Sequence, residues 1–202
     1  MPKKAIVIGG SIAGLLAARV LSDHFEEVIL IEKDKYTDDD QVRNGTPQAN
    51  HIHLLLVKGK EILQDFFPDL ERELIENGAN KIDFLNDGRF CLPSGWAQRF
   101  ESGVITFTCT RTLLENTIRH QVQKISKIKI HDNKAISSFV LKNAKKISLK
   151  TIANEEIHAD LIVDCTGRNT RTPDWLENIG YPKLTDTRVD SFVGYATRRY
   201  IP

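Results

Sequence analysis

The sequence predicts a mixed α/β fold built on a parallel sheet, and two observations lead to this prediction. First, the apolar run Ala5–Ile8 is followed by a glycine-containing turn and by helical periodicity over Ala13–Ser22. Second, Val28–Ile31 is another continuous apolar run, as expected for a strand covered on both faces. Strand, helix and strand fit within about thirty residues, which is the size of one βαβ unit.

Length and composition indicate an ordinary globular protein. The chain has 202 residues, of which 41% are hydrophobic and 27% charged, enough for one sizeable core or one domain plus part of another. The formal net charge of +1 provides no basic surplus for nucleic acid or an anionic membrane, so neither is expected as a partner. No stretch reaches the roughly 18 apolar residues of a membrane span, and we expect a cytoplasmic protein.

The candidate metal-binding and redox residues are few. Cys91, Cys109 and Cys165 are far apart and form no C-x-x-C pair, so we expect three buried, reduced thiols. His51 and His53 supply only half of a metal site, and no cysteine or carboxylate lies at a matching spacing. No metal site is predicted. The two histidines are expected to order their loop instead.

The remainder of the chain continues the α/β pattern. Asp34–Asn50 is polar, contains Asp38-Asp39-Asp40, and predicts a long surface loop. Thr110 is a candidate N-cap for its helix, with Thr112 and Glu115 as a competing capping box. Helices are expected over Leu54–Phe67, Asp69–Glu76, Thr110–Lys124 and Thr172–Ile179. Strands are expected over Ile82–Leu85, Arg89–Leu92, Val104–Thr108, a meander of Ser126–Ile130, Ala135–Leu141 and Lys146–Ile152, then Leu161–Val163 and Ser191–Tyr200.

The turn after the first strand has the spacing of a dinucleotide-binding loop with one substitution. The G-x-G-x-x-G fingerprint places Gly9 at the tight turn and Gly14 where the helix packs on the sheet, but its middle glycine is Ser11. Serine is small, and its hydroxyl is able to donate to a phosphate oxygen. The helix N-terminus behind the turn favours an anion.

Glu32 ends the second strand, about twenty residues after the loop, where a carboxylate accepts hydrogen bonds from ribose hydroxyls. A 2′-phosphate would be repelled there, which disfavours NADP in this loop. The alternative is an ordinary βα turn followed by a surface glutamate. The loop alone does not choose between NAD and FAD.

Further segments carry a resemblance to a known family. GGSIAG (9–14), TRTLLENTIR (110–119) and DLIVDCTGR (160–168), together with Glu32, resemble the FAD-dependent hydroxylase and epoxidase type of flavoprotein monooxygenase, which has the fold type of p-hydroxybenzoate hydroxylase. RNGTPQANHIHLLL (43–56), GWAQRFESG (95–103), RTPDWLENIGY (171–181) and VGYATRRY (193–200) are similar to a bacterial group within it. Members of that group also carry serine in the glycine loop.

The resemblance implies a Rossmann-like FAD-binding domain, formed by residues 1–80 and 109–185, and partial substrate-domain strands in 81–108 and 186–202. It implies that Glu32 binds the adenosine ribose, that Arg43 lies near the pyrophosphate and Arg111 faces FAD, and that Ala135 touches the adenine. It places Asp164 and Gly167 in a turn near the cofactor. The full set of implied FAD-binding residues is Gly9, Gly10, Ser11, Ile12, Ala13, Gly14, Glu32, Lys33, Arg43, Arg111, Ala135, Asp164 and Gly167.

Two of these residues have structural alternatives. Arg111 near a helix start is slightly unfavourable for the helix dipole, which favours a ligand role over a plain surface role. Asp164 is equally well explained as the residue that caps the following turn.

The activity implied by the resemblance is hydroxylation or epoxidation of a small organic substrate with NAD(P)H and O₂. Family members are about twice this length and carry a later G-D motif that meets the flavin side of FAD, so we expect an adenosine half-site here. An inactive FAD-binding fragment and one half of a two-chain enzyme are the alternatives. An NAD-dependent dehydrogenase is the least favoured. An unpartnered Ser191–Tyr200 strand would also predict self-association or pairing with a second chain.

Overall fold

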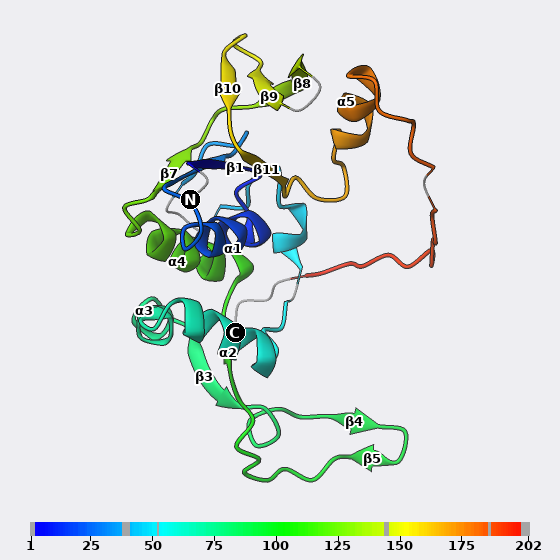
Figure 1. Cartoon of the computed structure of the whole chain (residues 1–202). Coiled ribbons are helices and arrows are strands. Elements are labelled where there is room, and N and C mark those ends of the chain that lie inside the picture. The colour runs from blue at the N-terminus through cyan, green and yellow to red at the C-terminus, as the bar shows by residue number, and fades with distance from the viewer. Residues whose placement is uncertain (1–2, 38–40, 52, 144–145, 186, 199–202) are drawn as a thin grey trace. The chain divides into compact units, whose positions relative to one another are not determined.

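Four parallel strands form the central sheet of the protein (Figure 1). The computed structural model describes residues 3–37, 41–51, 53–143, 146–185 and 187–198; the acidic cluster Asp38-Asp39-Asp40 lies outside these ranges. The strands of the sheet run in the order β11-β1-β2-β7. Their bounds are β1 (Lys4–Ile8), β2 (Glu27–Ile31), β7 (Ile128–His131) and β11 (Leu161–Asp164). The mixed α/β class with a parallel sheet is therefore confirmed.

The first βαβ unit follows directly from its residues. In β1 and β2, every residue after the first is buried, which explains why both read as continuous apolar runs. Helix α1 (Ile12–Leu21) connects them and packs on both strands, with Leu15 and Ala18 fully buried. The predicted bounds of all three elements hold to within one residue.

A three-stranded antiparallel sheet in the order β10-β9-β8 follows β7. It consists of β8 (Ile136–Asn143), β9 (Lys146–Thr151) and β10 (Glu156–His158). The predicted meander was therefore wrong in one strand, because Ser126–Ile130 corresponds to β7, which pairs in parallel with β2. The third strand of this sheet is β10, which was not predicted because three residues are too few to show an alternating hydrophobic pattern.

Helix α5 (Thr172–Asn178) packs against the antiparallel sheet. Trp175 and Phe139 meet edge to face, with ring centroids 5.1 Å apart. Both side chains belong to the buried cluster that contains Ile6, Ile8 and Leu149. The cluster therefore joins the parallel sheet, the antiparallel sheet and α5 around one core.

Contacts divide the chain into two units, Met1–Pro47 with Val122–Ala196 and Gln48–Gln121 with Thr197–Pro202. The second contains α2 (Val57–Phe66), α3 (Leu70–Glu76), β3 (Asn80–Asp83), β4 (Cys91–Leu92), β5 (Gly95–Trp96), β6 (Ile105–Thr108) and most of α4 (Arg111–Gln123). A 3₁₀ turn (Pro47–Asn50) stands at the boundary. The division differs from the predicted domains, in which 48–80 and 109–121 accompany the cofactor domain. A division by contacts does not test which residues bind the cofactor, so the predicted FAD-binding and substrate domains stay a prediction.

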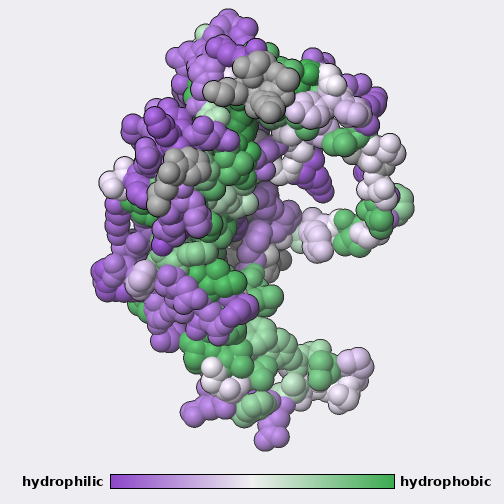
Figure 2. Space-filling view, viewed as in Figure 1, coloured by the Kyte–Doolittle hydropathy of each residue, from purple (hydrophilic) through white to green (hydrophobic). Residues whose placement is uncertain are grey.

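Two short antiparallel pairs, β3 with β6 and β4 with β5, form the strands of the second unit. The strand expected at Ile82–Leu85 lies two residues earlier, because the Asp83 carboxylate accepts hydrogen bonds from the backbone N–H groups of Leu85 and Asn86 and starts a turn. Hydrophobic residues, green in Figure 2, lie at the base of the β4–β5 hairpin, and Leu92 is exposed there.

The N-cap of α4 was predicted with a competing alternative. The Leu113 backbone N–H donates to the Thr110 hydroxyl at 3.0 Å, so Thr110 is the cap. The helix predicted over Leu54–Phe67 begins later, at Val57.

The expectation of three buried cysteines was wrong, since Cys91 is exposed and Cys109 and Cys165 are only partly buried. None of the helices in the described part of the chain is long and apolar enough to cross a bilayer.

The strand expected over Ser191–Tyr200 is absent from the described residues 191–198, and Arg199 and Tyr200 lie outside the described ranges. The Phe192 backbone N–H donates to Asp190 Oδ1 at 2.9 Å, and Phe192 has a φ of 52°. This local turn places one residue in the left-handed region and interrupts an extended chain. Val189, Phe192 and Tyr195 are consequently exposed.

Candidate functional site

The turn between β1 and α1 requires its outer two glycines. Gly9 has a φ of 98°, and a Cβ there would lie 2.6 Å from the Cys165 carbonyl oxygen. A Cβ on Gly14 would lie 1.7 Å from the Gly9 carbonyl oxygen. The first position therefore needs a left-handed backbone, and the second needs close approach of helix and strand, as the fingerprint demands.

The N-terminus of α1 faces this turn. Ser11 occupies the N-cap position with an extended backbone, and its side chain makes no capping hydrogen bond to the helix. The first-turn N–H groups, which begin at half-buried Ile12 and exposed Ala13, are thus not capped by that hydroxyl. Such groups and the helix dipole together suit a negatively charged ligand group.

Glu32 joins the end of β2 to this turn. Its Oε2 accepts a hydrogen bond from the Gly10 backbone N–H at 2.6 Å, and its Oε1 accepts one from the Asp34 backbone N–H at 2.9 Å. The residue is only 5% exposed. A carboxylate has about four lone-pair sites, so two bonds to the backbone leave capacity for further donors such as ribose hydroxyls.

Arg43 extends this network from the following loop. Its Nη1 lies 3.5 Å from Glu32 Oε2 and 3.5 Å from Asp34 Oδ2, and its guanidinium carbon lies 5.0 Å from the centroid of the Tyr36 ring. The Tyr36 hydroxyl donates to the Gly10 carbonyl oxygen at 2.6 Å. Asp34–Asn50 is therefore not a purely surface loop, because part of it packs on the glycine turn.

Sequence reasoning missed Asp34 and Tyr36. Tyr36 is the only aromatic residue in the polar stretch 34–50, which was the one available signal for it. A polar cavity of about 360 Å³ is lined by this segment, including Lys33, Asp34 and Arg43. Lys33 itself is exposed.

Asp164, at the end of β11, orders the loop that follows it. Its Oδ1 accepts the Thr166 backbone N–H at 2.7 Å and the Thr166 hydroxyl at 2.6 Å, and its Oδ2 accepts the Thr170 and Thr172 hydroxyls. Burial raises the pKa of the Asp164 carboxyl, but the hydrogen bonds from these threonines outweigh burial and hold that pKa below its usual value. The geometry matches the capping alternative.

The Asp164 loop also lies beside the glycine turn. The Cys165 backbone N–H donates to the Ile8 carbonyl oxygen at 2.7 Å, and Gly167 has a φ of 84°. Burial and the neighbouring Asp164 charge raise the pKa of the Cys165 thiol. That thiol is therefore protonated at neutral pH and is a poor nucleophile.

Ala135 and Arg111 are also among the predicted FAD-binding residues. Ala135 precedes β8, and its carbonyl oxygen accepts the Ile152 N–H at 3.0 Å; the adjacent Lys134 N–H donates to the Glu32 carbonyl oxygen at 2.9 Å. Ala135 thus belongs to the same region as Glu32. Arg111 lies in the second unit, where its Nη1 is 3.1 Å from Glu115 Oε2.

Each of the two histidines has a hydrogen-bonding partner. His53 Nδ1 lies 2.9 Å from the His51 carbonyl oxygen, and His51 Nδ1 lies 2.9 Å from the Thr197 hydroxyl. Within the described ranges, no group of three or more metal-ligating side chains gathers anywhere.

Comparison with known proteins identifies one similar sequence and several similar structures. No protein-family model matches the chain. The chain is 30% identical over 214 residues to Protein Rv3254 of Mycobacterium tuberculosis, covering 97% of this chain and 44% of that protein. It therefore spans less than half the length of this relative.

Solved structures with the same fold include flavin-dependent enzymes. PqsL, a probable FAD-dependent monooxygenase from Pseudomonas aeruginosa, matches with a TM-score of 0.63 at 13% identity, over 89% of this chain and 46% of its own. The flavin-dependent monooxygenase PieE, solved with FAD and substrate, matches with a TM-score of 0.62 at 16% identity, over 88% of this chain and 32% of its own. The chain therefore has the fold of part of the flavin-dependent monooxygenases.

Proposed function

We propose that the first unit is a Rossmann-like FAD-binding domain and that the chain serves a flavoprotein monooxygenase. The observation that carries this proposal is the buried contact between Glu32 and Gly10, which fixes a carboxylate beside the N-terminus of α1. One group suits ribose hydroxyls and the other suits a pyrophosphate. The fold shared with PqsL and PieE supports FAD over NAD.

Each residue of the site has a role in this proposal. Gly9 makes the tight turn, Gly10 fits between the turn and Glu32, and Gly14 lets α1 pack on the sheet. Ser11, Ile12 and Ala13 then present the first-turn N–H groups of α1 to the pyrophosphate. Glu32 accepts hydrogen bonds from the adenosine ribose. Arg43 supplies positive charge near the pyrophosphate, with Lys33 beside it. Ala135 contacts the adenine through its backbone, and Asp164 and Gly167 lie toward the rest of the cofactor. For Arg111, the FAD-facing role is the one that the family resemblance implies.

FAD, when bound, would supply the redox chemistry by which NAD(P)H and O₂ hydroxylate or epoxidise a small organic substrate, releasing NAD(P)⁺ and water. The chain's own contribution is to bind and orient the adenosine half. Three unpaired cysteines, none in a disulfide, accord with a reducing, cytoplasmic setting.

The second candidate is an FAD-binding protein without oxygenase activity of its own, or one half of a two-chain enzyme. The observation that favours it is the geometry of the site, since the contacts of Glu32 and Gly10 concern only the binding of the adenosine half of FAD. The substrate-binding and flavin-contacting parts of such an enzyme would then come from residues beyond those matched.

Purification of the protein with FAD, followed by its absorption spectrum and an NAD(P)H oxidation assay, tests both candidates. Bound flavin with NAD(P)H-dependent O₂ consumption supports the monooxygenase. Bound flavin without NAD(P)H oxidation supports the second candidate. A colourless protein that binds NAD but not FAD contradicts both and indicates a dehydrogenase.

A further inference from the structure

Tyr36 contacts three separate segments of the first unit. Its hydroxyl donates to the Gly10 carbonyl oxygen at 2.6 Å, and its backbone N–H donates to Asp132 Oδ2 at 2.8 Å. The guanidinium carbon of Arg43 lies over its ring, 5.0 Å from the centroid. This half-buried residue therefore connects the glycine turn, the segment that follows β7 and the loop that carries Arg43.

Two carboxylates lie beside the glycine turn, and Arg43 is a cation that contacts both. Glu32 Oε2 is 2.6 Å from the Gly10 nitrogen, so its negative charge stands where the proposed site would receive a pyrophosphate. Arg43 Nη1 lies 3.5 Å from this oxygen and 3.5 Å from Asp34 Oδ2, and it offsets part of the charge of the two acids. The affinity of the turn for an anionic group therefore depends on the position of Arg43.

These two ion pairs do not fix the plane of the Arg43 guanidinium. Both involve the same nitrogen, Nη1, and both distances of 3.5 Å are long for a hydrogen bond. The Arg43 side chain is buried, and a cation over an aromatic ring is attracted more strongly where water is excluded. The ring of Tyr36 therefore supplies a contact to the guanidinium that the two carboxylates do not.

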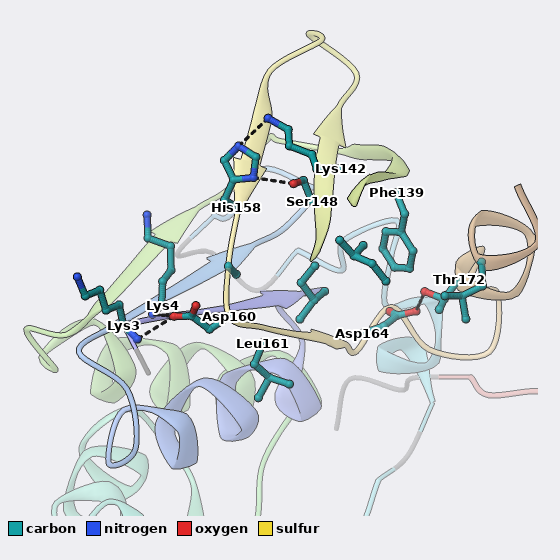
Figure 3. A pocket seen from close by; sticks show the side chains of 14 residues that line it. Lys3, Lys4, Phe139, Lys142, Ser148, His158, Asp160, Leu161, Asp164 and Thr172 are labelled. Atoms are coloured by element: carbon teal, nitrogen blue, oxygen red, sulfur yellow. Dashed lines mark hydrogen bonds between the residues drawn. The ribbon is translucent and has the colours of Figure 1, made fainter. Parts of the chain in front are cut away.

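A larger cavity of the first unit, about 1000 Å³, has polar side chains that bond to one another (Figure 3). His158 Nδ1 lies 2.6 Å from the Ser148 hydroxyl oxygen, and His158 Nε2 lies 3.3 Å from Lys142 Nζ. The Asp160 carboxylate accepts the Lys3 backbone N–H at 2.8 Å. Contacts within the protein account for these groups, so this cavity points to no particular ligand.

We propose that Tyr36 is a positioning residue for phosphate recognition. Its ring holds the Arg43 guanidinium beside the glycine turn, and the guanidinium held there supplies the positive charge that favours a diphosphate ligand. The bonds from Tyr36 to Gly10 and Asp132 fix the ring itself. This role rests on the proposed FAD site, and it adds a residue that neither the glycine fingerprint nor the family resemblance includes.

Titration calorimetry with ADP and with adenosine tests this role without flavin or catalysis. Both probes carry the ribose hydroxyls that Glu32 is proposed to bind, and only ADP carries phosphates. Tyr36→Leu removes the ring, so this variant is expected to bind ADP about 5- to 10-fold more weakly and adenosine with unchanged affinity. Tyr36→Phe keeps the ring over Arg43 and is expected to retain the ADP affinity to within about twofold.

Arg43→Met removes the cation that the ring holds. It is expected to weaken ADP binding at least as much as Tyr36→Leu does. Adding Tyr36→Leu to Arg43→Met should cause no further loss of ADP affinity, because the ring then has no guanidinium to hold. Tyr195→Leu is the matched control, since Tyr195 is 82% exposed in the same unit, and it should bind both probes as the wild type does.

Several outcomes would overturn the role of Tyr36 and leave the FAD site in place. Equal losses of ADP and adenosine affinity in Tyr36→Leu indicate a purely structural residue, and equal losses in Tyr36→Phe and Tyr36→Leu assign the effect to the hydroxyl. Unchanged ADP affinity in Tyr36→Leu, or additive losses in the double variant, also contradict the proposal.

A wild-type protein that binds neither ADP nor adenosine overturns the proposed function, and the role of Tyr36 with it. If Tyr36→Leu does not fold, Tyr36→Met takes its place with the same expected results, because methionine adapts to an irregular space and has no ring.

Discussion

The Glu32 carboxylate accepts the Gly10 backbone N–H at 2.6 Å, so the end of β2 holds the glycine turn after β1 in place. The same carboxylate accepts the Asp34 N–H, and Arg43 Nη1 lies 3.5 Å away. The backbone N–H groups of Gly10 and Asp34 and the Arg43 guanidinium thus converge on one buried acid. This acid is the organising residue of the candidate cofactor site.

Glu32→Ala is expected to weaken FAD binding by about 1–3 kcal/mol, because it removes charge-assisted hydrogen bonds to the ribose. Equilibrium titration of flavin fluorescence measures the change. Glu27→Ala is the matched control, since Glu27 lies at the other end of β2 and pairs with Lys4 and Lys129. Unchanged FAD affinity in Glu32→Ala would remove this residue from the site.

Gly10→Ala is expected to destabilise the protein by about 1–3 kcal/mol through overpacking. The new Cβ would lie 1.9 Å from the Tyr36 hydroxyl oxygen and 2.9 Å from Glu32 Cβ. Adding Tyr36→Phe should recover part of the loss. Gly194→Ala, with no heavy atom within 4 Å of its Cβ, should change the urea midpoint little. Equal effects at the two glycines would refute the packing argument.

Asp164→Asn is expected to cost about 1–2 kcal/mol at neutral pH, a value reduced for partial exposure. The folded-state pKa of Asp164 is lowered by the threonine hydrogen bonds despite burial. Its stabilising contribution is therefore present above the unfolded pKa, near pH 4, and is lost as pH falls through the folded pKa.

Urea unfolding of wild type and Asp164→Asn between pH 7 and pH 2 checks this pH dependence. The difference between the two proteins should shrink below about pH 4. Exposed Asp65→Asn on α2 serves as the control and should have little effect at pH 7. A difference that stays constant over the whole range would show that the charge of Asp164 is not what stabilises the loop.

Trp175→Ala is expected to cost about 3–5 kcal/mol, and Trp175→Phe is expected to cost less, because it removes a smaller part of the buried ring. Phenylalanine preserves the edge contact with Phe139 and removes an indole N–H that is buried with no hydrogen-bond partner among the described residues. Thermal unfolding of both variants measures the two costs. If Trp175→Phe destabilises the protein as much as Trp175→Ala, the indole N–H has a hydrogen-bond acceptor, and that acceptor is left without a donor in both variants.

The local part of the fold could be predicted from the sequence. β1, α1 and β2 have continuous or helical apolar patterns, and the glycine spacing is local, so Gly9, Gly14 and Glu32 could be placed together from the chain alone. The Thr110 cap is a contact within one turn and could likewise be predicted.

Pairing between distant segments could not be predicted in the same way. The residues of β7 predict a strand, but they do not predict that this strand pairs with β2 and not with β8. Arg43, Tyr36 and Asp34 meet only because a long loop folds back over Gly10. The alternation in 191–200 resembles a strand. The side-chain turn at Asp190 interrupts it, and no strand of the described residues pairs with this segment.

Fluorescence titration of the purified chain with FAD, ADP and FMN tests the central claim most directly. The account predicts that FAD binds, that ADP competes with it because both occupy the adenosine half-site at Glu32 and the N-terminus of α1, and that FMN alone binds far more weakly. Absence of FAD binding, or FMN binding as tight as that of FAD, would contradict the assignment.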